Sequence, residues 1–357
     1  MIKPIAIHLP QFHPFPENDE WWGKGFTEWT NVVKGKPLFE GHYQPHLPAD
    51  LGFYDLRLAE ARLAQINLAK EYGIYGFCYY HYWFNGKRLM QEPLDRMLLN
   101  KEEDFPFMLC WANENWTRRW DGQEQEVLMK QNYSEADDIA HIHFLINHFF
   151  SDVRYIKVDG KPFVAIYRPD LFPDISRTLA VWRQEALKLG LEGLHIAYFQ
   201  SFNNNTPPGT LGFDMAINFE PSYANKPYPE FSLLSKLYNK VGIKRYDFAN
   251  GIYSYAKLVE NAMNRFIVNK DIYPGITPMW DNAARRKANA TIFKGSTPEL
   301  YGKWLQHIVS KYKLANAPNK YLFINAWNEW AEGNHLEPCQ KWGKRYLEMT
   351  KSKIDEQ

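Results

Sequence analysis

Short runs of hydrophobic residues alternate with helix-length segments along the whole chain. Eight of these runs are short enough to be strands: Pro4–Leu9, Ile74–Tyr82, Phe107–Trp111, Phe163–Tyr167, Leu194–Gln200, Phe213–Asn218, Gly275–Asp281 and Tyr321–Trp327. Helices are expected between several of them: Leu56–Glu71, Ala136–Phe150, Ile175–Leu189 and Pro298–Tyr312. Strands that alternate with helices indicate a parallel sheet of β/α units. Eight such units predict an α/β fold that closes into a (β/α)8 TIM barrel.

The spare length of the chain lies in connections that run from a strand to the next helix. The chain has 357 residues, whereas a bare barrel needs about 250, so roughly 100 are available for insertions. Long connections follow the first, third and sixth predicted strands, at residues 10–55, 112–155 and 219–260. Such loops form the face of a barrel that carries active sites. We therefore expect one catalytic domain over residues 1–357, with its site among these loops.

Charge and cysteine content narrow the class of protein. The formal net charge is +1 and no long run of like charge stands out, so neither nucleic acid nor an anionic membrane is an expected partner. No stretch reaches the roughly 18 apolar residues of a membrane span. Cys78, Cys110 and Cys339 are expected to be reduced thiols. Because the N-terminus lacks a signal-peptide pattern, we expect a cytoplasmic protein, or a periplasmic one if a signal sequence has been removed.

Aromatic and polar residues gather at the predicted strand ends. Aromatic residues make up 16% of the chain, and ten of the 13 tryptophans lie at these ends or in the loops that follow. Rings that cover the CH faces of a sugar, interleaved with polar groups for its hydroxyls, are typical of a carbohydrate site. We expect about half of these rings only to pack loops onto the barrel. The residues predicted to bind substrate are His8, Gln11, His13, Trp29, Tyr80, His81, Tyr82, Trp111, Asn113, Glu114, Trp116, Gln200, Glu220, Trp280, Asp281, Trp327, Asn328 and Trp330.

Two glutamates follow the last predicted strand in the segment Trp-Asn-Glu-Trp-Ala-Glu-Gly, residues 327–333. Glu329 and Glu332 are three residues apart, so in a helical turn their Cβ atoms would lie about 5–6 Å from each other. Glycoside cleavage needs one carboxyl group to protonate the leaving oxygen and another to act as base or nucleophile. Flanking rings would desolvate one carboxyl and raise its pKa. We predict Glu329 and Glu332 as the catalytic pair; the alternative is that Glu332 only caps the turn.

The same segment resembles the Trp-Asn-Glu-Trp-x-Glu-Gly element of glycoside hydrolase family 99, the endo-α-1,2-mannosidases and mannanases. The runs His8–His13, Gly25–Asn31 and Trp111–Trp116 are similar to those of WbsX-type proteins. These are family-99-like proteins of bacterial O-antigen and polysaccharide loci. The WbsX-type resemblance covers nearly the whole chain, whereas the resemblance to family 99 itself is confined mainly to the fold and the Glu329/Glu332 element. Together they imply a barrel that cleaves an α-linked, mannose-type glycan with retention.

The resemblance also implies the roles of the pair. Glu329 would deprotonate the 2-hydroxyl of the sugar, and that oxygen would attack the anomeric carbon to give a 1,2-anhydro sugar. Glu332 would protonate the leaving oxygen and then activate water. Ala331 and Asn334 depart from the endo-mannosidase pattern, which leaves the sugar open more than the pair. No metal or organic cofactor is expected.

Two other functions fit the same residues. A cytoplasmic glycosyltransferase or polysaccharide-assembly enzyme is one alternative, because WbsX-type proteins are often described in that way. Against it, the chain has no Gly-x-Gly-x-x-Gly after the first strand and no Asp-x-Asp on an apolar strand. A non-catalytic glycan-binding barrel is the other alternative, since a wall of tryptophans alone would suit it.

A metal-dependent hydrolase is a weaker alternative. His8, His13 and His81 with Asp281 could be ligands, but His8 and His13 are five residues apart instead of forming a His-x-His motif. Hydroxyl binding or structural hydrogen bonds are favoured for these histidines. Four further acids could bind hydroxyls or replace the catalytic acid: Glu28, Glu114, Glu220 and Asp281. Glu114 is the first reserve among them, and its alternative role is to pin a loop.

Overall fold

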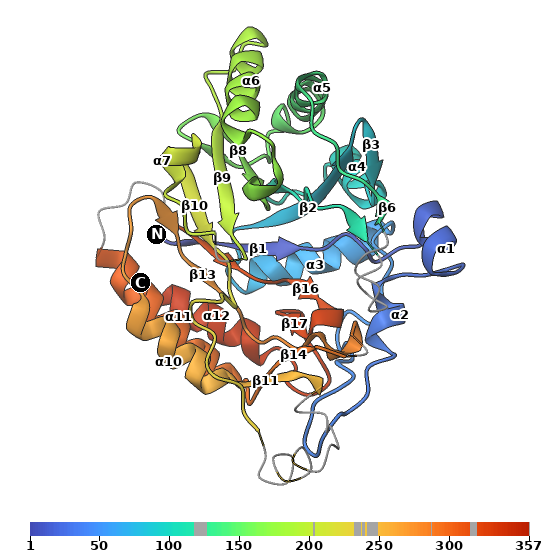
Figure 1. Cartoon of the computed structure of the whole chain (residues 1–357), viewed down its shortest axis with the longest axis vertical. Helices are drawn as coiled ribbons and strands as arrows, with labels where there is room; N and C mark the ends of the chain where they lie inside the picture. Colours follow the sequence, from blue (N-terminus) through green and yellow to red (C-terminus); the bar gives the residue numbers. More distant parts are fainter. Residues whose placement is uncertain are drawn as a thin grey trace.

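The computed structural model describes residues 1–117, 127–202, 204–231, 237, 240, 249–286, 288–314 and 320–356. Its centre is a barrel of parallel strands surrounded by helices (Figure 1). The strands of the wall are β1 (Lys3–His8), β2 (Gly76–Phe84), β4 (Phe107–Trp111), β8 (Lys161–Ile166), β9 (His195–Gln200), β10 (Met215–Asn218), β12 (Ile272–Tyr273), β13 (Gly275–Ile276) and β15 (Tyr321–Ile324). Their order in space follows the chain, and β1 pairs with both β2 and β15. The predicted (β/α)8 barrel is confirmed.

The hydrophobic runs form strands because both faces of each strand are buried. Every residue of β4 and of β15 is buried, as expected for parallel strands with helices outside and side chains inside. Rings from strands that are not neighbours in the wall meet inside the barrel. The Phe323 ring centroid lies 6.1 Å from that of Phe163 and 5.9 Å from that of Phe199. Part of the aromatic excess therefore belongs to the core.

The seventh position of the wall differs from the prediction. The sequence predicts one strand over Gly275–Asp281, whereas the chain pairs earlier, through β12 with β10 and β13 with β15. Pro274 separates the two short strands because proline has no N–H for the ladder. At Gly275 a Cβ atom would lie 1.8 Å from the carbonyl oxygen of Asn218. The bounds of this predicted strand were therefore wrong, since the chain leaves the wall after Ile276.

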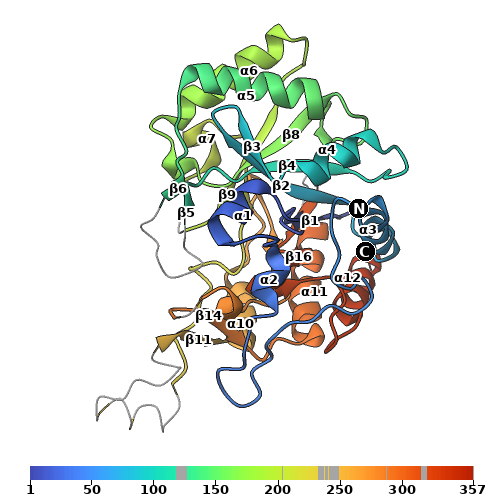
Figure 2. The ribbon, with the colours of Figure 1, turned by 90° about the vertical axis from the view of Figure 1, so that its right-hand side faces the viewer.

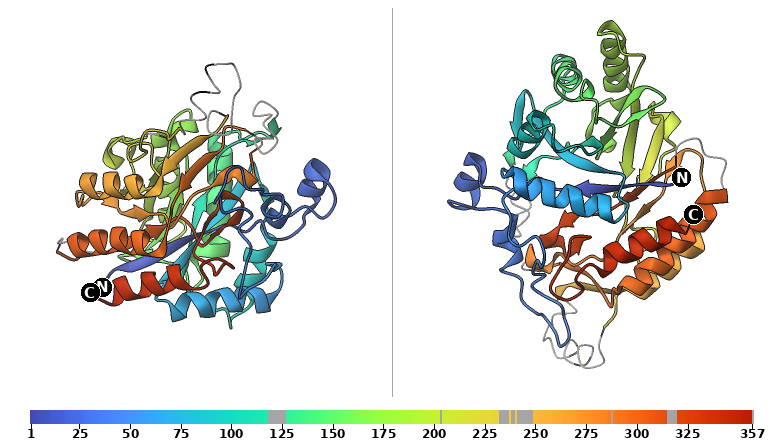
Figure 3. Two further views of the ribbon diagram at one scale, coloured as in Figure 1. Left: turned by 90° about the horizontal axis from the view of Figure 1, so that it is seen from below. Right: turned by 180° about the vertical axis from the view of Figure 1, so that it is seen from behind.

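Helices cover the outside of the wall. They are α3 (Ala59–Glu71), α4 (Glu92–Leu99), α5 (Glu135–Leu145) with the π-helical turn η2 (Ile146–Phe150), α6 (Ile175–Lys188), α7 (Pro208–Leu211), α10 (Tyr255–Arg265), α11 (Pro298–Leu314) and α12 (Arg345–Asp355). The four predicted helices correspond to α3, α5 with η2, α6 and α11. α5 packs against α6, and α11 contacts both α10 and α12 (Figures 1 and 3). Within the described ranges, no helix combines the length and apolar character needed to cross a membrane.

Smaller elements lie in the connections. They are α1 (Pro16–Trp22), α2 (Glu28–Val32), β3 (Lys87–Leu89), β5 (Trp116–Thr117), β6 (Val127–Met129), β7 (Lys157–Val158), η3 (Pro169–Leu171), β11 (Gly251–Ser254), η4 (Asn282–Ala284), β14 (Thr291–Lys294), β16 (Asn328–Glu329), η5 (Trp330–Glu332) and β17 (Asn334–His335). β11 pairs in parallel with β14 (Figure 2). Both α2 and η4 pack against η5. Distant connections therefore meet at the ends of β1, β13 and β15. Trp120, one of the ten tryptophans counted above, lies outside the described residues.

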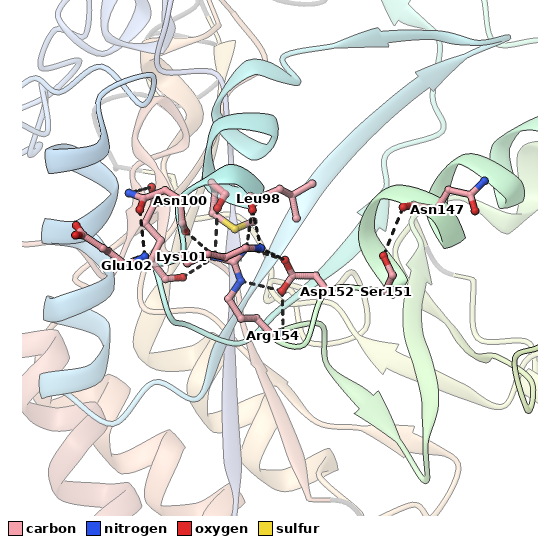
Figure 4. Close-up of polar contacts among 10 residues, drawn as sticks. Leu98, Asn100, Lys101, Glu102, Asn147, Ser151, Asp152 and Arg154 are labelled. Atoms are coloured by element: carbon pink, nitrogen blue, oxygen red, sulfur yellow. Dashed lines mark hydrogen bonds and ion pairs between the residues drawn. The ribbon is translucent and has the colours of Figure 1, made fainter.

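A hydrogen-bonded cluster around Arg154 lies at the N-terminal end of the barrel (Figure 4). The backbone carbonyl of Arg154 accepts a hydrogen bond of 3.1 Å from Phe107, the first residue of β4. Its guanidinium donates to both carboxylate oxygens of Asp152, each at 2.8 Å. It also donates to the backbone carbonyl oxygens of Met97, Leu98, Asn100 and Glu103. The cluster thus satisfies carbonyl groups at the end of α4 and ties them to β4.

Candidate functional site

A cleft of about 560 Å³ lies at the C-terminal ends of the strands. Its lining includes residues at or just after the ends of β1, β2, β4, β9 and β15. Among the residues predicted as catalytic or substrate-binding, nine line this cleft: Gln11, Tyr80, Tyr82, Glu114, Trp116, Gln200, Trp280, Glu329 and Glu332. The barrel thus brings together side chains from six of its strands or the connections that follow them. Their roles in catalysis or binding stay predictions.

Glu329 is held at the mouth of the barrel by hydrogen bonds to β1. β15 ends at Ile324, before the predicted end of the strand, and the backbone N–H of Trp327 then donates to the carbonyl oxygen of Ile7 at 2.7 Å. The side-chain amide of Asn328 accepts from the backbone N–H of Leu9 at 2.7 Å and donates to its carbonyl oxygen at 3.0 Å. Asn328 is fully buried. It therefore anchors Glu329 instead of lining the cleft.

Glu332 is the last residue of η5, and a backbone contact with Asp281 fixes it. The backbone N–H of Asp281 donates to the carbonyl oxygen of Glu332 at 2.7 Å. The turn ends at Gly333 with φ of 53°, and a Cβ atom there would lie 2.9 Å from the carbonyl oxygen of Asp281, so glycine is required. The Asp281 carboxylate contacts His42 at 2.6 Å and Gln44 at 2.8 Å. Asp281 thus joins two loops and does not line the cleft.

Arg285, which no sequence pattern marks, lies between three carboxylates. Its Nη2 donates to Glu28 Oε1 at 2.5 Å and to Glu329 Oε2 at 3.0 Å, while its Nη1 is 2.7 Å from Glu332 Oε1. Glu28 Oε1 also accepts from the backbone N–H of Ala331 at 3.2 Å. Glu28 is fully buried, whereas the side chain of Glu332 is 22% exposed. Three connections therefore converge on one guanidinium beside the cleft.

The electrostatics of this cluster follow from burial and from an excess of carboxylates. Burial raises the pKa of Glu329 to about 8, the Arg285 guanidinium opposes that rise, and the nearby Glu332 and Glu28 carboxylates add to it. Burial also raises the pKa of Glu28, again against Arg285. A buried carboxyl beside like charges prefers to keep its proton. The predicted increase in the pKa of one of the two candidate carboxyl groups thus falls on Glu329.

A hydrogen-bonded network around Glu337 supports Trp330, one of the two residues between Glu329 and Glu332. The carboxylate of Glu337 accepts hydrogen bonds from Trp330 Nε1 at 2.6 Å, from the Tyr54 hydroxyl at 2.8 Å and from Gln65 Nε2 at 2.7 Å. Burial raises the pKa of Glu337 to about 7, and these donors oppose the rise. No sequence pattern marked Glu337, because two of its partners, Tyr54 and Gln65, lie more than 270 positions away along the chain. This network keeps Trp330 in the core and out of the cleft.

Several aromatic residues that were not predicted also line the cleft: Tyr167, Phe202, Phe219, Tyr223 and Phe293. Tyr167, Phe202 and Phe219 come within two residues of the ends of β8, β9 and β10. Position at a strand end was therefore the signal that could have found them. Lys226 lines the same wall, with its Nζ 4.3 Å from the centroid of the Tyr253 ring. Glu114 lies at another wall, where its Oε1 accepts from Arg168 at 2.9 Å.

The predicted histidines lie away from the cleft. His8 contacts Gln65 at 3.1 Å, and His81 contacts His141 at 3.0 Å. His13 is 3.1 Å from a backbone carbonyl oxygen three residues earlier. All three predicted histidines are buried, so they serve as hydrogen-bonding core residues here. In the part of the chain that the structure describes, no three His, Cys, Asp or Glu side chains form a group that could hold a metal ion.

Four predicted tryptophans also pack in the core. Trp111, Trp327 and Trp330 are at most 1% exposed, and Trp29 is 8% exposed. Trp111 stacks on Trp182 with centroids 5.8 Å apart. None of the four lines the cleft within the described residues. They act as packing residues, as expected for part of the tryptophan set, whereas Trp116 and Trp280 reach the cleft.

Two further predicted polar residues are satisfied by the protein itself. Asn113 donates to the Tyr133 hydroxyl at 3.0 Å and is fully buried. The Glu220 carboxylate accepts from the backbone N–H of Ser222 at 2.7 Å and from Asn225 Nδ2 at 2.6 Å. Both side chains therefore shape loops, and neither lines the main cleft.

Comparison with known proteins gives sequence relatives along the whole chain. The family model described as "Glycosyltransferase WbsX" matches residues 4–350. Two proteins named "Uncharacterized protein WxcX", from the B100 and ATCC 33913 strains of Xanthomonas campestris pv. campestris, are each 42% identical over 352 residues. The match covers 98% of this chain and 49% of each relative. The chain therefore spans about half the length of these curated relatives.

Solved structures share the fold at low sequence identity. A glycoside hydrolase-like protein matches with a TM-score of 0.62 and 14% identity over 99% of this chain and 93% of its own. The family 99 endo-α-mannosidase of Bacteroides thetaiotaomicron matches with a TM-score of 0.59 and 14% identity over 99% and 96%. The barrel thus has a glycoside hydrolase-like fold, and since the family model spans nearly all of the sequence, the chain belongs to the WbsX glycosyltransferase family.

Proposed function

We propose that this protein is a glycoside hydrolase that cleaves an α-linked glycan with Glu329 and Glu332 as its catalytic carboxyl groups. One observation carries the proposal: both carboxylates line the same cleft and contact the two terminal nitrogens of one guanidinium. Two carboxyl groups that face one ligand site are the requirement of glycoside cleavage. The glycoside hydrolase-like fold of the barrel supports the same chemistry.

The proposed reaction uses the 2-hydroxyl of the sugar as nucleophile. Glu329 takes the 2-hydroxyl proton while O2 bonds to C1, and the C1–O bond to the leaving group breaks as its oxygen takes a proton from Glu332. In the second step Glu332 takes a proton from water, whose oxygen bonds to C1. The C1–O2 bond then breaks, and O2 recovers its proton from Glu329. Two inversions at C1 give net retention.

The different environments of the two glutamates suit these roles. A base that must deprotonate a hydroxyl gains from a raised pKa, and burial raises that of Glu329 to about 8. The Arg285 guanidinium, 3.0 Å away, supports the ionised form that the base needs. Glu332 is the more exposed of the two, which gives it access to water in the second step. Because the ionised fraction of Glu329 grows as pH rises toward 8, kcat/KM should rise with pH over this range.

The glycan is proposed to be of α-mannose type. The fold is shared with an endo-α-mannosidase, and the aromatic walls of the cleft suit the CH faces of hexose rings. The glutamates would address O1 and O2 of one residue, while rings such as Tyr223 and Trp116 would contact neighbouring sugars.

A panel of α-linked oligosaccharides, α-mannans first, tests the proposal. We expect wild type to release reducing sugar, and Glu329→Gln and Glu332→Gln to lose about 10²- to 10⁴-fold in kcat, the usual contribution of a general acid or base. Glu348→Gln, an exposed glutamate of α12, is the matched control and should keep full activity. Near-normal rates in both cleft variants would exclude the pair, and cleavage of 2-deoxy substrates would exclude the 2-hydroxyl route.

A glycosyltransferase is the second candidate, because the matching family carries that name. The same cleft could pass the sugar to an acceptor hydroxyl instead of to water. Nucleotide sugars with and without glycan acceptors, assayed beside the panel, separate the two functions. Transfer that needs the nucleotide sugar would replace the hydrolase proposal, whereas glycan binding without turnover would favour a binding barrel.

A further inference from the structure

A buried carboxylate shares the guanidinium of Arg285 with Glu329. Arg285 Nη2 is 2.5 Å from Glu28 Oε1 and 3.0 Å from Glu329 Oε2. One N–H-bearing nitrogen therefore links a residue of the connection after β1 to a residue of the connection after β15. The two carboxylates are 301 positions apart in the sequence numbering, 28 against 329, and only the barrel brings them together.

Glu28 cannot reach a sugar in the cleft. Its exposed fraction is zero, and it is absent from the lining among the described residues. Its position is fixed on both sides: its backbone N–H donates to the Gln11 carbonyl oxygen at 3.0 Å, and its Oε1 accepts from the Ala331 N–H at 3.2 Å. Ala331 lies in the turn between Glu329 and Glu332, so the hydrogen bond from its N–H to Glu28 helps to hold the backbone that carries both glutamates.

The contact with Arg285 also orients Glu329. Oε2 of Glu329 receives the guanidinium N–H, which leaves Oε1 as the oxygen available to a ligand. A planar guanidinium fork holds a carboxylate in a defined orientation, unlike the single point charge of a lysine. Arg285 is itself held by Glu28 and Glu332, so the rotamer of Glu329 depends on the whole cluster.

The charges of the cluster do not balance. Three carboxylates meet one guanidinium, so full ionisation would leave a net charge of −2 beside the cleft. Among the described residues, the phenols of Tyr80 and Tyr82 also interact with Glu329 and are neutral near pH 7. The cationic Arg286 lines the same cleft and is unchanged in every variant compared below. Removing the charge of Glu28 should therefore weaken the hold of Glu329 on its proton, and removing the charge of Arg285 should strengthen it.

We propose that Glu28 and Arg285 are a pair of positioning residues that fix the orientation and the charge of Glu329 without touching the sugar themselves. This inference rests on the proposed function for its use in catalysis. The opposite effects of Glu28 and Arg285 on the pKa of Glu329 do not rest on it, because they exist whether or not a glycan is cleaved. The pair makes Glu329 responsive to a residue in another connection of the barrel.

Carbon-13 NMR of protein labelled at the glutamate carboxyl groups tests the inference without any substrate. The resonance of Glu329 is assigned by its loss in Glu329→Gln and followed from pH 5 to 10. We expect its midpoint to move down by at least about one pH unit in Glu28→Gln and up by a similar amount in Arg285→Gln. The double variant should give an intermediate midpoint, because the two effects oppose each other.

Glu92→Gln and Arg96→Gln are the matched controls, since these residues form an exposed pair at 2.6 Å on α4. Neither should move the midpoint of Glu329. If Arg285→Gln does not fold, Arg285→Lys replaces it as a variant that keeps the positive charge. The direction of the Glu329 midpoint shift in Glu28→Gln then tests the inference by itself. The inference would be overturned if the Glu329 midpoint moved in the same direction in Glu28→Gln and Arg285→Gln, or did not move in Glu28→Gln. Opposite shifts without glycan cleavage would overturn only the proposed function, and cleavage that needs Glu329 without such shifts would overturn only the positioning pair.

Discussion

Two arginine clusters at opposite ends of the barrel use the same chemical groups with opposite results. At the N-terminal end, the Arg154 guanidinium meets one carboxylate and four backbone carbonyl oxygens. Its hydrogen bonds hold the pKa of Asp152 well below the usual range. At the C-terminal end, Arg285 meets three carboxylates, and burial raises the pKa of Glu329 to about 8. A balanced cluster stabilises the fold, whereas an unbalanced one leaves a proton available for exchange.

This difference agrees with the division of labour in barrels. The C-terminal face of a barrel carries reactive groups, while the N-terminal face mainly serves stability. A buried charge stabilises a protein only when its partners and hydrogen bonds are complete. The Arg154 cluster meets that condition (Figure 4). The Arg285 cluster does not, so we expect it to lower stability in return for reactivity.

The largest expected effect on stability comes from breaking the balanced cluster. Arg154→Met should lower the free energy of unfolding by about 3–5 kcal/mol, because it leaves Asp152 without its guanidinium partner and buried carbonyl groups without donors. Urea denaturation at pH 7 measures this loss. Arg177→Met removes an exposed partner of Glu135 at 2.5 Å and should cost at most about 1 kcal/mol. Equal losses in the two variants would contradict the role given to Arg154.

A smaller effect of opposite sign is expected at the other end. The pKa of Glu329 is raised from 4.5 to about 8 in the folded protein, so its contribution to stability is complete below pH 4.5 and is lost as pH rises through 8. Glu329→Gln removes that loss. It should raise the free energy of unfolding by on the order of 1–2 kcal/mol at pH 8.5, since one pKa unit is worth about 1.36 kcal/mol and Arg285 loses a partner.

Stability measured at pH 5 and at pH 8.5 distinguishes the Arg154 cluster from the Arg285 cluster. At pH 5, Glu329→Gln should differ little from wild type. Asp152→Asn should lose stability at both pH 5 and pH 8.5, because the contribution of Asp152 is present above the ordinary pKa of 3.8 and is lost only as pH falls through its lower folded value. Denaturation curves of both variants at both pH values give the comparison. A destabilised Glu329→Gln at pH 8.5 would contradict the unbalanced state of the Arg285 cluster.

The smallest expected effect separates binding from reaction within the cleft. Tyr223 lines the cleft and is 55% exposed. Tyr223→Ala should raise KM by about 3- to 10-fold, as a stacked ring contributes on the order of 1 kcal/mol, with kcat unchanged. Tyr228, five residues along the same connection and 93% exposed, does not line the cleft among the described residues. Tyr228→Ala should change neither constant, and equal effects of the two variants would remove Tyr223 from the binding wall.

The barrel could be predicted because each strand is buried on both faces, which leaves continuous hydrophobic runs in the sequence. The bounds of the seventh strand could not be placed, because they also depend on the close approach of Gly275 to Asn218 in a neighbouring strand. Tryptophans at strand ends were harder still. A ring such as Trp111 or Trp327 can point into the core or into the cleft, and its place in the sequence does not decide which.

The location of the glutamate pair could also be predicted, since both residues follow the last strand and line the cleft as expected. Arg285 could not. It pairs with Glu28 across 257 positions and with Glu329 across 44, and no local pattern encodes such a contact. Only the meeting of three connections in space reveals that the proposed pair shares a counter-ion.

The backbone contact between Asp281 and Glu332 has a mechanical consequence. Asp281 begins the loop that carries Arg285, and its N–H holds the carbonyl of Glu332 at 2.7 Å, with Gly333 packed against it. A main-chain hydrogen bond therefore joins the loop that carries Arg285 to the turn that carries Glu332. Polar groups that are already oriented need little reorganisation when charge shifts during a reaction. In this barrel, that preorganisation is built into the main chain itself.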